Sequence, residues 1–388
     1  MVDIHNYRRR LERTLENIRE SSEISKENKK IIMKFHDNCF AEGISICKTE
    51  RYLYDLYRMA KTIDKSIANL TKDDLKEIVA DIEKKDWSPY SKQTFKVLLK
   101  KFFKWMGGSE EYPERIKWLK ANMRSTYRKS PEELLTEEEV KSLIRFAGTT
   151  RDRAFIAVLY ESGCRIGEVG NLRIKDIAFD EFGARITVTG KTGPRIVRVV
   201  NSAIYLQEWV NLHPSQDPES YVWIKGNGET LGYSRFVSII KKAAVAAGIK
   251  KPVNPHNFRH SRASYLAQHI TESQMKNYLG WEQSSKMAAV YVHLKDTDDA
   301  ILQMNGLKKD PAREEKVLKP IACAKCRTKN EVTNKFCKIC GFPLDREAAQ
   351  EIISKETKQN AASQVMDLLL RDEDVIRLIS DKMKEIKI

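Results

Sequence analysis

Two neighbouring stretches decide the fold: PHNFRHSRASYLAQH, from Pro255 to His269, and YLGWEQSSKMAAVYVHL, from Tyr278 to Leu294. Their spacing of apolar residues predicts helices between Asn257 and Tyr291. Basic, imidazole and phenol side chains are interspersed with the apolar ones. A helical region that holds these groups so close together is a candidate for a polar reaction centre.

Two earlier pieces accompany these stretches: ESGCRIGEVGNLRIKDI, from Glu161 to Ile177, and ARITVTGKTGPRIVRVV, from Ala184 to Val200. In the second piece, alternating β-branched residues flank the turn GKTGP, which predicts a β-hairpin. Thr136 and Glu139 form a capping box that opens a helix just upstream. The region from there on therefore combines helices with a few strands.

In their order and spacing, the four pieces resemble the signature of the tyrosine recombinases, the phage-integrase and Xer-type family of site-specific DNA strand-exchange enzymes. The resemblance covers essentially all of residues 132–300. It implies a protein that is mainly α with a small β component, with a mixed α/β catalytic domain over 132–305. It also implies a helical, SAM-like core-binding domain over 48–130, preceded by a helical extension over 1–47. In the family, the two larger domains clamp the DNA duplex.

The resemblance also implies the residues that carry the reaction. Carried over position by position, the catalytic set is Arg165, Lys191, His256, Arg259, Trp281 and Tyr291, with Glu168 as a supporting carboxylate. Tyr291 is the implied nucleophile. The family has His or Trp at the place of Trp281, and an indole can donate a hydrogen bond there but cannot transfer a proton as an acid-base group.

These residue types suit attack on a phosphodiester. Such attack builds negative charge on the nonbridging oxygens, which Arg165 and Arg259 can bind through guanidinium forks. A tyrosine with a pKa near 10 must lose its proton as it attacks, which makes His256 the candidate base. The departing 5′ oxygen needs a proton, which makes Lys191 the candidate acid. A phosphotyrosine intermediate conserves the bond energy, so neither ATP nor a catalytic metal is required.

Taken singly, each motif has an ordinary explanation. Arg165 and Glu168, three residues apart, could be a surface ion pair. By chemistry alone, the rival nucleophiles are Tyr160, Tyr265 and Tyr278. Order and spacing favour Tyr291. Cys164 is expected to be a packed small residue, and His260 to orient its neighbours.

The charge of the chain points to a polyanionic partner. The 388 residues include 69 Lys+Arg and 54 Asp+Glu, for a net charge of +15. From Ser91 to Lys129, eleven basic residues face three acidic ones, and the apolar residues there follow helical spacing. The lysines expected to contact the DNA backbone are Lys92, Lys96, Lys100 and Lys104. A solvated lysine face is the ordinary alternative. Thr71 is expected to cap the preceding helix.

The last part of the chain contains four cysteines in the pattern C-x2-C-x10-C-x2-C. They are Cys323, Cys326, Cys337 and Cys340. This spacing predicts a zinc ribbon over 320–345 that binds a structural Zn²⁺, whereas four unrelated thiols are the alternative. The ribbon is expected to be a binding module, with DNA or a protein as its partner. Residues 346–388 are predicted as a helical tail whose last helix serves as a short coiled coil, docks on another subunit or packs on its own chain.

The predicted function is site-specific recombination or integration of double-stranded DNA. One strand is cut through a 3′-phosphotyrosine intermediate, and strands are exchanged through a Holliday junction by a homotetramer on two sites. The alternatives are a type IB topoisomerase-like enzyme that relaxes DNA, and a noncatalytic DNA-binding regulator. No run of about 18 apolar residues and no apolar signal segment is present, so a cytoplasmic, nucleoid-associated protein without a membrane anchor is expected.

Overall fold

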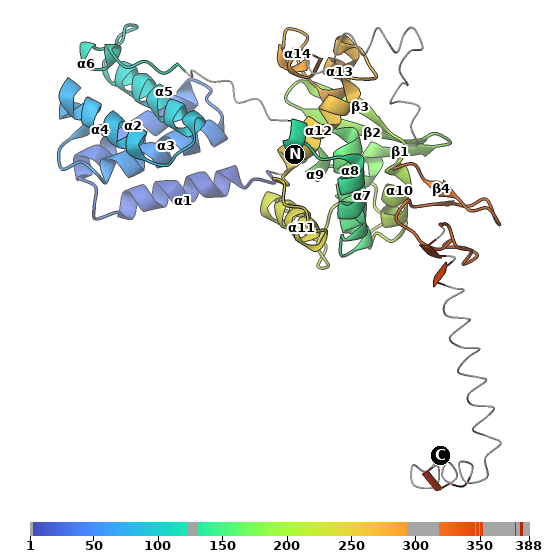
Figure 1. Ribbon diagram of the computed structural model, residues 1–388. Coiled ribbons are helices and arrows are strands. Elements are labelled where there is room, and N and C mark those ends of the chain that lie inside the picture. The colour runs from blue at the N-terminus through green and yellow to red at the C-terminus, as the bar shows by residue number, and fades with distance from the viewer. Residues whose placement is uncertain are drawn as a thin grey trace. The chain divides into compact units, whose positions relative to one another are not determined.

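The computed structural model describes residues 3–122, 131–292, 318–345, 347–348, 350–351, 377 and 381–382. The chain divides into two compact units, Met1–Ser130 and Pro131–Ile388. In Figure 1 the described part of the first unit is helical, whereas the second unit combines helices with small sheets. The prediction of a mainly α protein with a small β component is confirmed.

The first unit consists of α-helices joined by short loops. Its elements are α1 (Tyr7–Glu20), α2 (Lys26–Ala41), α3 (Ile46–Ala60), the 3-10 turn η1 (Ile67–Asn69), α4 (Lys72–Lys84), α5 (Pro89–Met106) and α6 (Glu114–Lys117).

One hydrophobic core joins all of these helices. Phe35 of α2 and Phe102 of α5 are fully buried and meet edge to face, with ring centroids 5.0 Å apart. Residues 3–47 contain α1, α2 and the start of α3, and Leu11 and Ile18 of α1 belong to this same core. These helices therefore pack against those that follow them.

The second unit begins at Pro131 and contains the remaining elements. Its elements up to the sheet are η2 (Pro131–Glu133), α7 (Glu137–Arg145), α8 (Thr150–Ser162), α9 (Ile166–Gly170) and η3 (Ile174–Asp176). The sheet contains β1 (Ile177–Asp180), β2 (Gly183–Gly190) and β3 (Gly193–Val199). The elements that follow are α10 (Ala203–Asn211), α11 (Tyr233–Ala246), α12 (Pro255–Leu266), α13 (Glu272–Leu279), α14 (Met287–Val292), β4 (Ile321–Ala322) and β5 (Lys329–Asn330).

The two predicted helix caps are present. Thr71 accepts a hydrogen bond from the Asp74 amide (3.3 Å), and the Asp74 carboxylate accepts one from the Thr71 amide (2.7 Å). Thr136 and Glu139 make the same reciprocal pair at the start of α7. Such pairs satisfy amides that the first turn of a helix leaves without partners.

The predicted hairpin is also present, within a three-stranded antiparallel sheet in the order β1-β2-β3. Lys191 and Thr192 form the turn between β2 and β3. On β2, Ala184, Ile186 and Val188 are buried and alternate with exposed residues. One face of the hairpin therefore packs on the helices.

The stretch from Asn257 to Tyr291 forms three helices, α12, α13 and α14. Thr271 and Gln274 make a capping box that starts α13, and Gly280 ends that helix with φ 64°. Left-handed φ values are open to glycine with little cost. These two local signals allow α14 to return and pack against α12.

Glu161, near the C-terminal end of α8, connects that helix to the hairpin. Its buried carboxylate accepts hydrogen bonds from the amides of Val200 (3.0 Å), Asn201 (3.0 Å) and Ser202 (2.6 Å). Those amides form the junction between β3 and α10. One side chain thus fixes the position of the hairpin against the helices.

Among the described residues, no helix is long and apolar enough to cross a membrane.

We expect Glu161→Gln to destabilise the second unit. Glutamine keeps one acceptor oxygen, but its NH2 group would face backbone N–H groups, which are also donors. At least one of these buried N–H groups would lose its acceptor, which lowers the free energy of unfolding by roughly 1–3 kcal/mol. Thermal unfolding of the full chain should show a lower midpoint for this variant. Glu181→Gln, in the exposed turn before β2, is the matched control and should leave the midpoint unchanged.

Candidate active site

The C-terminal end of α13 presents three successive carbonyl oxygens, and an arginine donates a hydrogen bond to each. The pairs are Arg195 with the carbonyl of Tyr278 (2.9 Å), Arg259 with that of Leu279 (2.8 Å) and Arg165 with that of Gly280 (3.2 Å). The last carbonyls of a helix have no partner within it, and they form the negative end of its dipole. This helix end therefore gathers guanidinium groups from three separate parts of the chain.

Gly280 is required by this packing as well as by its backbone conformation. A Cβ atom at Gly280 would lie 2.6 Å from Nη1 of Arg195. Real side chains do not approach that closely, so the guanidinium fills the place of a side chain.

Arg165 stands immediately before α9 and is paired with Glu168 in the first turn of that helix. The Glu168 carboxylate accepts hydrogen bonds from the Arg165 amide (2.8 Å) and from its Nη1 (3.0 Å). The Arg165 side chain is 36% exposed, whereas that of Glu168 is only 3% exposed. The pair suggested by the sequence is thus formed, with the carboxylate buried and the guanidinium reaching the surface.

Arg195 of β3 is a site residue that the sequence reasoning missed. It donates to both carboxylate oxygens of Glu168, at 3.0 and 2.9 Å, in a bidentate pair. Burial alone would raise the pKa of Glu168, but the hydrogen bond and charge of Arg195 and the amide of Arg165 outweigh it and lower that pKa. Glu168 is therefore an anion held between two guanidiniums.

A signal for Arg195 was available in the hairpin register. Arg195 pairs across the strands with Val188, which is buried. Directly opposed residues on antiparallel strands share one face of the sheet. A register counted from the GKTGP turn would have placed Arg195 on the packed face.

Gly190, at the end of β2, allows the hairpin to approach α9. A Cβ atom there would lie 2.3 Å from Oε1 of Glu168. The hairpin whose tip carries Lys191 is consequently packed directly against the Glu168 carboxylate.

Arg259 of α12 is buried and donates to the carbonyls of Gly163 (2.9 Å) and Leu279 (2.8 Å). Burial, followed by the charge of Arg165, lowers its pKa to about 10. It thus remains protonated at neutral pH. Its guanidinium also lies 5.3 Å from the ring centre of Trp281, within the range of a cation–π contact.

Tyr291 of α14 lies between two rings. Trp281 stacks on it with centroids 5.7 Å apart and planes 7° from parallel, and Nδ1 of His260 makes a hydrogen bond with its hydroxyl. The residue is buried, and burial raises the pKa of its phenol to about 12, against the opposing charge of Arg259. The phenol is thus protonated at neutral pH.

His256, the predicted base, is exposed on the first turn of α12, and its ring stacks on that of His260 with the centroids 5.8 Å apart. His260, expected only to orient its neighbours, is the imidazole that contacts the Tyr291 hydroxyl.

Lys191 is exposed at the tip of the β2–β3 hairpin. The structure therefore brings together Arg165, Glu168, Arg259, Trp281 and Tyr291. Lys191 is exposed on the turn that follows Gly190, the residue that packs against Glu168. His293, two residues after Tyr291, lies outside the described residues.

Two of the rival tyrosines, Tyr278 and Tyr160, are enclosed within the second unit. Tyr278 is largely enclosed, and its hydroxyl donates to the Arg198 carbonyl at 2.8 Å. Tyr160 is buried in α8, and burial raises the pKa of both phenols. Cys164 is fully buried, and burial raises the pKa of its thiol to about 11, which suits a packed thiol and not a nucleophile.

The lysines of α5 are partly buried and have partners in their own chain. Lys96 forms an ion pair with Glu83 (2.5 Å), and Lys92 donates to the Glu83 carbonyl (2.7 Å). Lys100 and Lys104 lie over the ring of Tyr112, with Nζ at 4.2 and 5.7 Å from its centre. Glu83 thus offsets part of the positive charge that the sequence predicted for this face.

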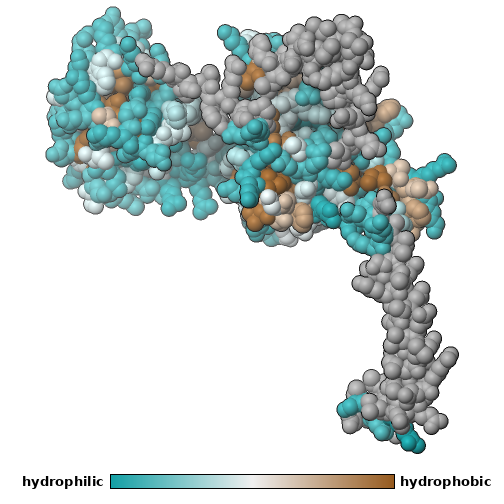
Figure 2. All heavy atoms as spheres, in the orientation of Figure 1, coloured by the Kyte–Doolittle hydropathy of each residue, from teal (hydrophilic) through white to brown (hydrophobic). Residues whose placement is uncertain are grey.

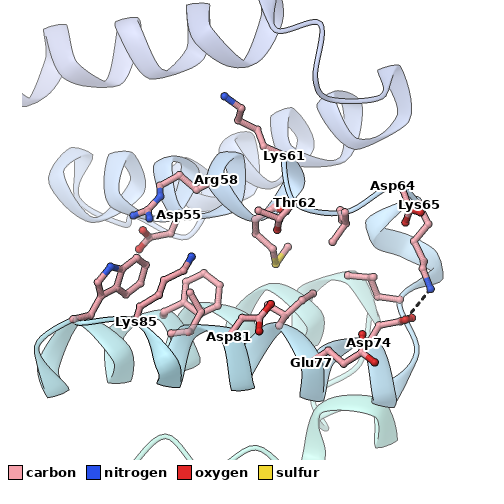
Figure 3. A pocket seen from close by; sticks show the side chains of 17 residues that line it. Asp55, Arg58, Lys61, Thr62, Asp64, Lys65, Asp74, Glu77, Asp81 and Lys85 are labelled. Carbon is pink, nitrogen blue, oxygen red and sulfur yellow. Dashed lines mark hydrogen bonds and ion pairs between the residues drawn. The ribbon is translucent and has the colours of Figure 1, made fainter.

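A separate pocket lies in the first unit between α3 and α4 (Figure 3). It is lined by both signs of charge, including Asp55, Arg58, Asp81 and Lys85, and by Trp87. The residues of the arginine cluster belong to the second unit and do not line it.

The four cysteines of the C-terminal segment come together. Their sulfur atoms all lie within 4.8 Å of one another, with Cys323 and Cys340 at 3.6 Å and Cys326 and Cys337 at 3.4 Å. Four thiolates at about 2.3 Å from one tetrahedral zinc would be roughly 3.8 Å apart. The donor set and its size therefore fit a zinc ion.

The two halves of this cysteine segment repeat one turn. The Arg327 amide donates to the Cys323 carbonyl, and the Gly341 amide donates to the Cys337 carbonyl, each at 2.9 Å. Arg327 and Gly341 both have positive φ, 60° and 68°. Each half therefore presents its two sulfurs through the same backbone bend.

The cysteine segment also packs against the helices of the second unit. Glu331 is buried, with Oε2 3.8 Å from Nε of Arg153 on α8, and Thr333 lies 3.5 Å from the Tyr205 hydroxyl of α10. Burial, followed by a hydrogen bond with Glu208, raises the pKa of Glu331 to about 8. The segment is thus joined to α8 and α10.

Comparison with known sequences places the chain among recombinases. Residues 133–298 match the model of the Phage integrase family. The chain is 30% identical over 260 residues to the tyrosine recombinase XerA of Pyrococcus furiosus, covering 65% of this chain and 87% of that protein. It is 28% identical over 268 residues to a tyrosine recombinase of Thermosipho africanus, covering 65% of this chain and 91% of that protein.

Solved structures share the fold. A lambda integrase dimer bound to a COC′ core site matches with a TM-score of 0.56 at 16% identity, covering 70% of this chain and 79% of that one. The XerH recombinase bound to its difH substrate matches with a TM-score of 0.51 at 20% identity, covering 75% of this chain and 94% of that one.

We expect Arg195→Met to destabilise the second unit strongly, because it leaves the buried Glu168 carboxylate with one partner in place of two. Breaking a buried pair from one side costs roughly 3–5 kcal/mol. Urea denaturation should show a clearly lower midpoint. Arg198→Met on the same strand removes an ion pair with Asp180 whose side chains are 38% and 35% exposed, and it should change the midpoint little.

Proposed function

Because the chain belongs to the phage integrase family of tyrosine recombinases, enzymes that cleave and rejoin DNA, we propose that Tyr291 is the nucleophile of this reaction. The observation that carries this proposal is the position of Tyr291. Its hydroxyl contacts an imidazole, its ring stacks on Trp281, and Arg259 is close enough to oppose the rise of its pKa.

We propose Arg165 and Arg259 as the groups that bind the scissile phosphate. Their guanidiniums donate to the adjacent carbonyls of Gly280 and Leu279, so they lie side by side. Both are charged at neutral pH, and charge-assisted donors fixed in advance stabilise an anionic transition state most effectively. Glu168 supports them by holding Arg165 in place from its buried position.

The remaining members of the set are proposed from the family resemblance and their placement. Lys191, on the exposed hairpin tip, would give a proton to the departing 5′ oxygen. His256 lies three residues before Arg259 on α12, so the two side chains lie on neighbouring positions of one helix face. Trp281 would donate its indole N–H and pack against the reacting group.

The proposed reaction begins with attack by Tyr291, which leaves a 3′-phosphotyrosyl bond and a free 5′ hydroxyl. A 5′ hydroxyl from a second duplex then attacks that bond, and repetition of these steps resolves a Holliday junction. The phosphotyrosine bond stores the energy for rejoining, so the chemistry calls for neither ATP nor a catalytic metal. Four protomers on two sites would form the working assembly, acting at the nucleoid.

We propose residues 132–305 as the catalytic domain and residues 48–130 as the core-binding domain, which folds on one core with the preceding helices. Lys92, Lys96, Lys100 and Lys104 are proposed DNA contacts. Lys96 would have to exchange its pairing with Glu83 for a phosphate, a replacement that is inexpensive for a partly exposed ion pair.

The cysteine segment, residues 320–345, is proposed to bind one structural Zn²⁺ through Cys323, Cys326, Cys337 and Cys340. A segment of this size has little core of its own, so the metal would supply much of its folding energy. Its surface carries apolar side chains, including Ile339 at 71% and Phe342 at 39% exposure. Figure 2 shows the surface coloured by hydropathy, with brown and pale-brown residues gathered near the point where the grey tail leaves the second unit. Clustered exposed apolar groups favour a protein partner for this surface.

Tyr291→Phe should bind DNA but form no covalent adduct, because it lacks the attacking oxygen. Host genomic fragments are incubated with each protein, the mixture is denatured, and DNA that stays attached is sequenced. The wild type should yield one enriched site. Tyr265→Phe, which alters a half-buried tyrosine of α12, is the control and should yield the same site. An adduct on Tyr291→Phe would contradict the assignment of the nucleophile.

Native mass spectrometry should show one zinc ion per chain. Cys337→Ser should lose it, since three thiolates and a hydroxyl bind zinc more weakly than four thiolates. Cys47→Ser, at an exposed thiol of the first unit, should keep the full zinc content. A wild-type mass without any increment would remove zinc from the proposal.

A further inference from the structure

We propose that His260 is the general base that takes the proton from Tyr291. This inference rests on the proposed function, since it assumes that Tyr291 is the nucleophile. It goes beyond the family motif, which points to His256 and assigns no reaction step to His260.

The first argument is contact. Nδ1 of His260 makes a hydrogen bond with the Tyr291 hydroxyl, and the two ring centres are 5.8 Å apart. A general base must be within hydrogen-bond reach of the proton that it removes. His256 lies one helical turn from His260 and stacks on its ring. His260 is thus the imidazole that contacts the phenol directly.

The second argument is need. Tyr291 is buried, and its raised pKa leaves the phenol protonated at neutral pH. A phenolate does not form there unaided, so attack requires a partner that accepts the proton as the new bond forms. Imidazole is the side chain whose ordinary pKa lies nearest neutrality, which suits it to accept and later return a proton.

The third argument is orientation. Trp281 stacks on one face of the Tyr291 ring, while His260 is bonded to the hydroxyl at its edge. His260 also sits on α12 next to Arg259, whose guanidinium is bonded to the end of α13. The base and a proposed phosphate ligand are therefore adjacent residues on one helix.

The step balances as follows. The Tyr291 O–H bond breaks and its proton moves to Nδ1 of His260, which becomes an imidazolium. The phenolic oxygen forms a bond to phosphorus, and the bond from phosphorus to the 5′ oxygen breaks. That oxygen leaves with the electron pair and takes a proton from Lys191. In rejoining, an incoming 5′ hydroxyl gives its proton to the now neutral Lys191 as its oxygen bonds to phosphorus. The bond from phosphorus to the tyrosine oxygen breaks, and the imidazolium returns its proton to that oxygen.

The test separates the proton acceptor from the proton donor. The probe is a nicked duplex carrying the site recovered with wild-type protein, made with either oxygen or sulfur at the 5′ bridging position. Sulfur leaves without protonation, so it replaces a missing acid but not a missing base. Single-turnover adduct formation is measured for wild type, His260→Asn, His260→Ala and Lys191→Ala. His269→Asn, next to Tyr265 beyond the end of α12, is the matched control.

We expect His260→Asn to slow adduct formation by about 100-fold or more on both probes. Asparagine can keep a hydrogen bond near the position of Nδ1 but cannot accept the proton. Added imidazole should speed the His260→Ala variant, which a purely structural role would not allow. Lys191→Ala should form the adduct slowly on the probe with bridging oxygen and at close to the wild-type rate on the probe with bridging sulfur.

Two results would overturn the inference: a wild-type rate for His260→Asn, or restoration of that variant by sulfur alone. If His260→Asn binds the probe weakly, its rate is measured at saturating protein. The response of His260→Ala to added imidazole is then decisive, and the absence of any response would also contradict the assignment of His260 as the base. Failure of the proposed function looks different, because wild type would then form no adduct, or Tyr291→Phe would form one.

Discussion

The end of one short helix imposes the constraint on which the site depends. α13 finishes at Leu279, and the carbonyls of Tyr278, Leu279 and Gly280 lie at the end of the helix, where its own backbone offers no further donors. Buried carbonyls without partners are costly, so donors must come from elsewhere. Three arginines from β3, α12 and the start of α9 provide them, and in doing so hold three separate segments at one point.

That arrangement has an electrostatic consequence. Three guanidiniums gathered at one helix end repel one another, and the Glu168 carboxylate compensates only part of their charge. Arg195 and Glu168 are the enclosed half of the cluster, with side chains 12% and 3% exposed, whereas Arg165 is 36% exposed. The uncompensated positive charge is thus left on the accessible side, where an anionic phosphate can approach.

Much of the fold follows from local patterns in the sequence. The capping boxes at Thr71 and Thr136 and the hairpin around Lys191 are governed by neighbouring residues, and each formed as predicted. The family resemblance supplied Arg165, Glu168 and Arg259, and the structure brings them together. The stretch from Asn257 to Tyr291 is helical as predicted, and the capping box at Thr271 and the left-handed Gly280 divide it into α12, α13 and α14.

What the sequence could not provide are contacts set by tertiary packing. The face on which Arg195 lies follows from its register with Val188, but its bidentate pair with Glu168 depends on how the sheet packs against α9. His256 and His260 are one helical turn apart, so the choice between them depends on where α14 brings Tyr291. The lysines of α5 gain partners from the segments on either side of that helix, Glu83 before it and Tyr112 after it, and the helical spacing alone does not show these contacts.

The contact of Glu331 and Thr333 with α8 and α10 gives the cysteine segment a thermodynamic link to the rest of its unit. An ion that binds only the folded form stabilises every part that must fold with it. A metal held by the four cysteines would therefore stabilise α8 and α10 together with the segment that binds it.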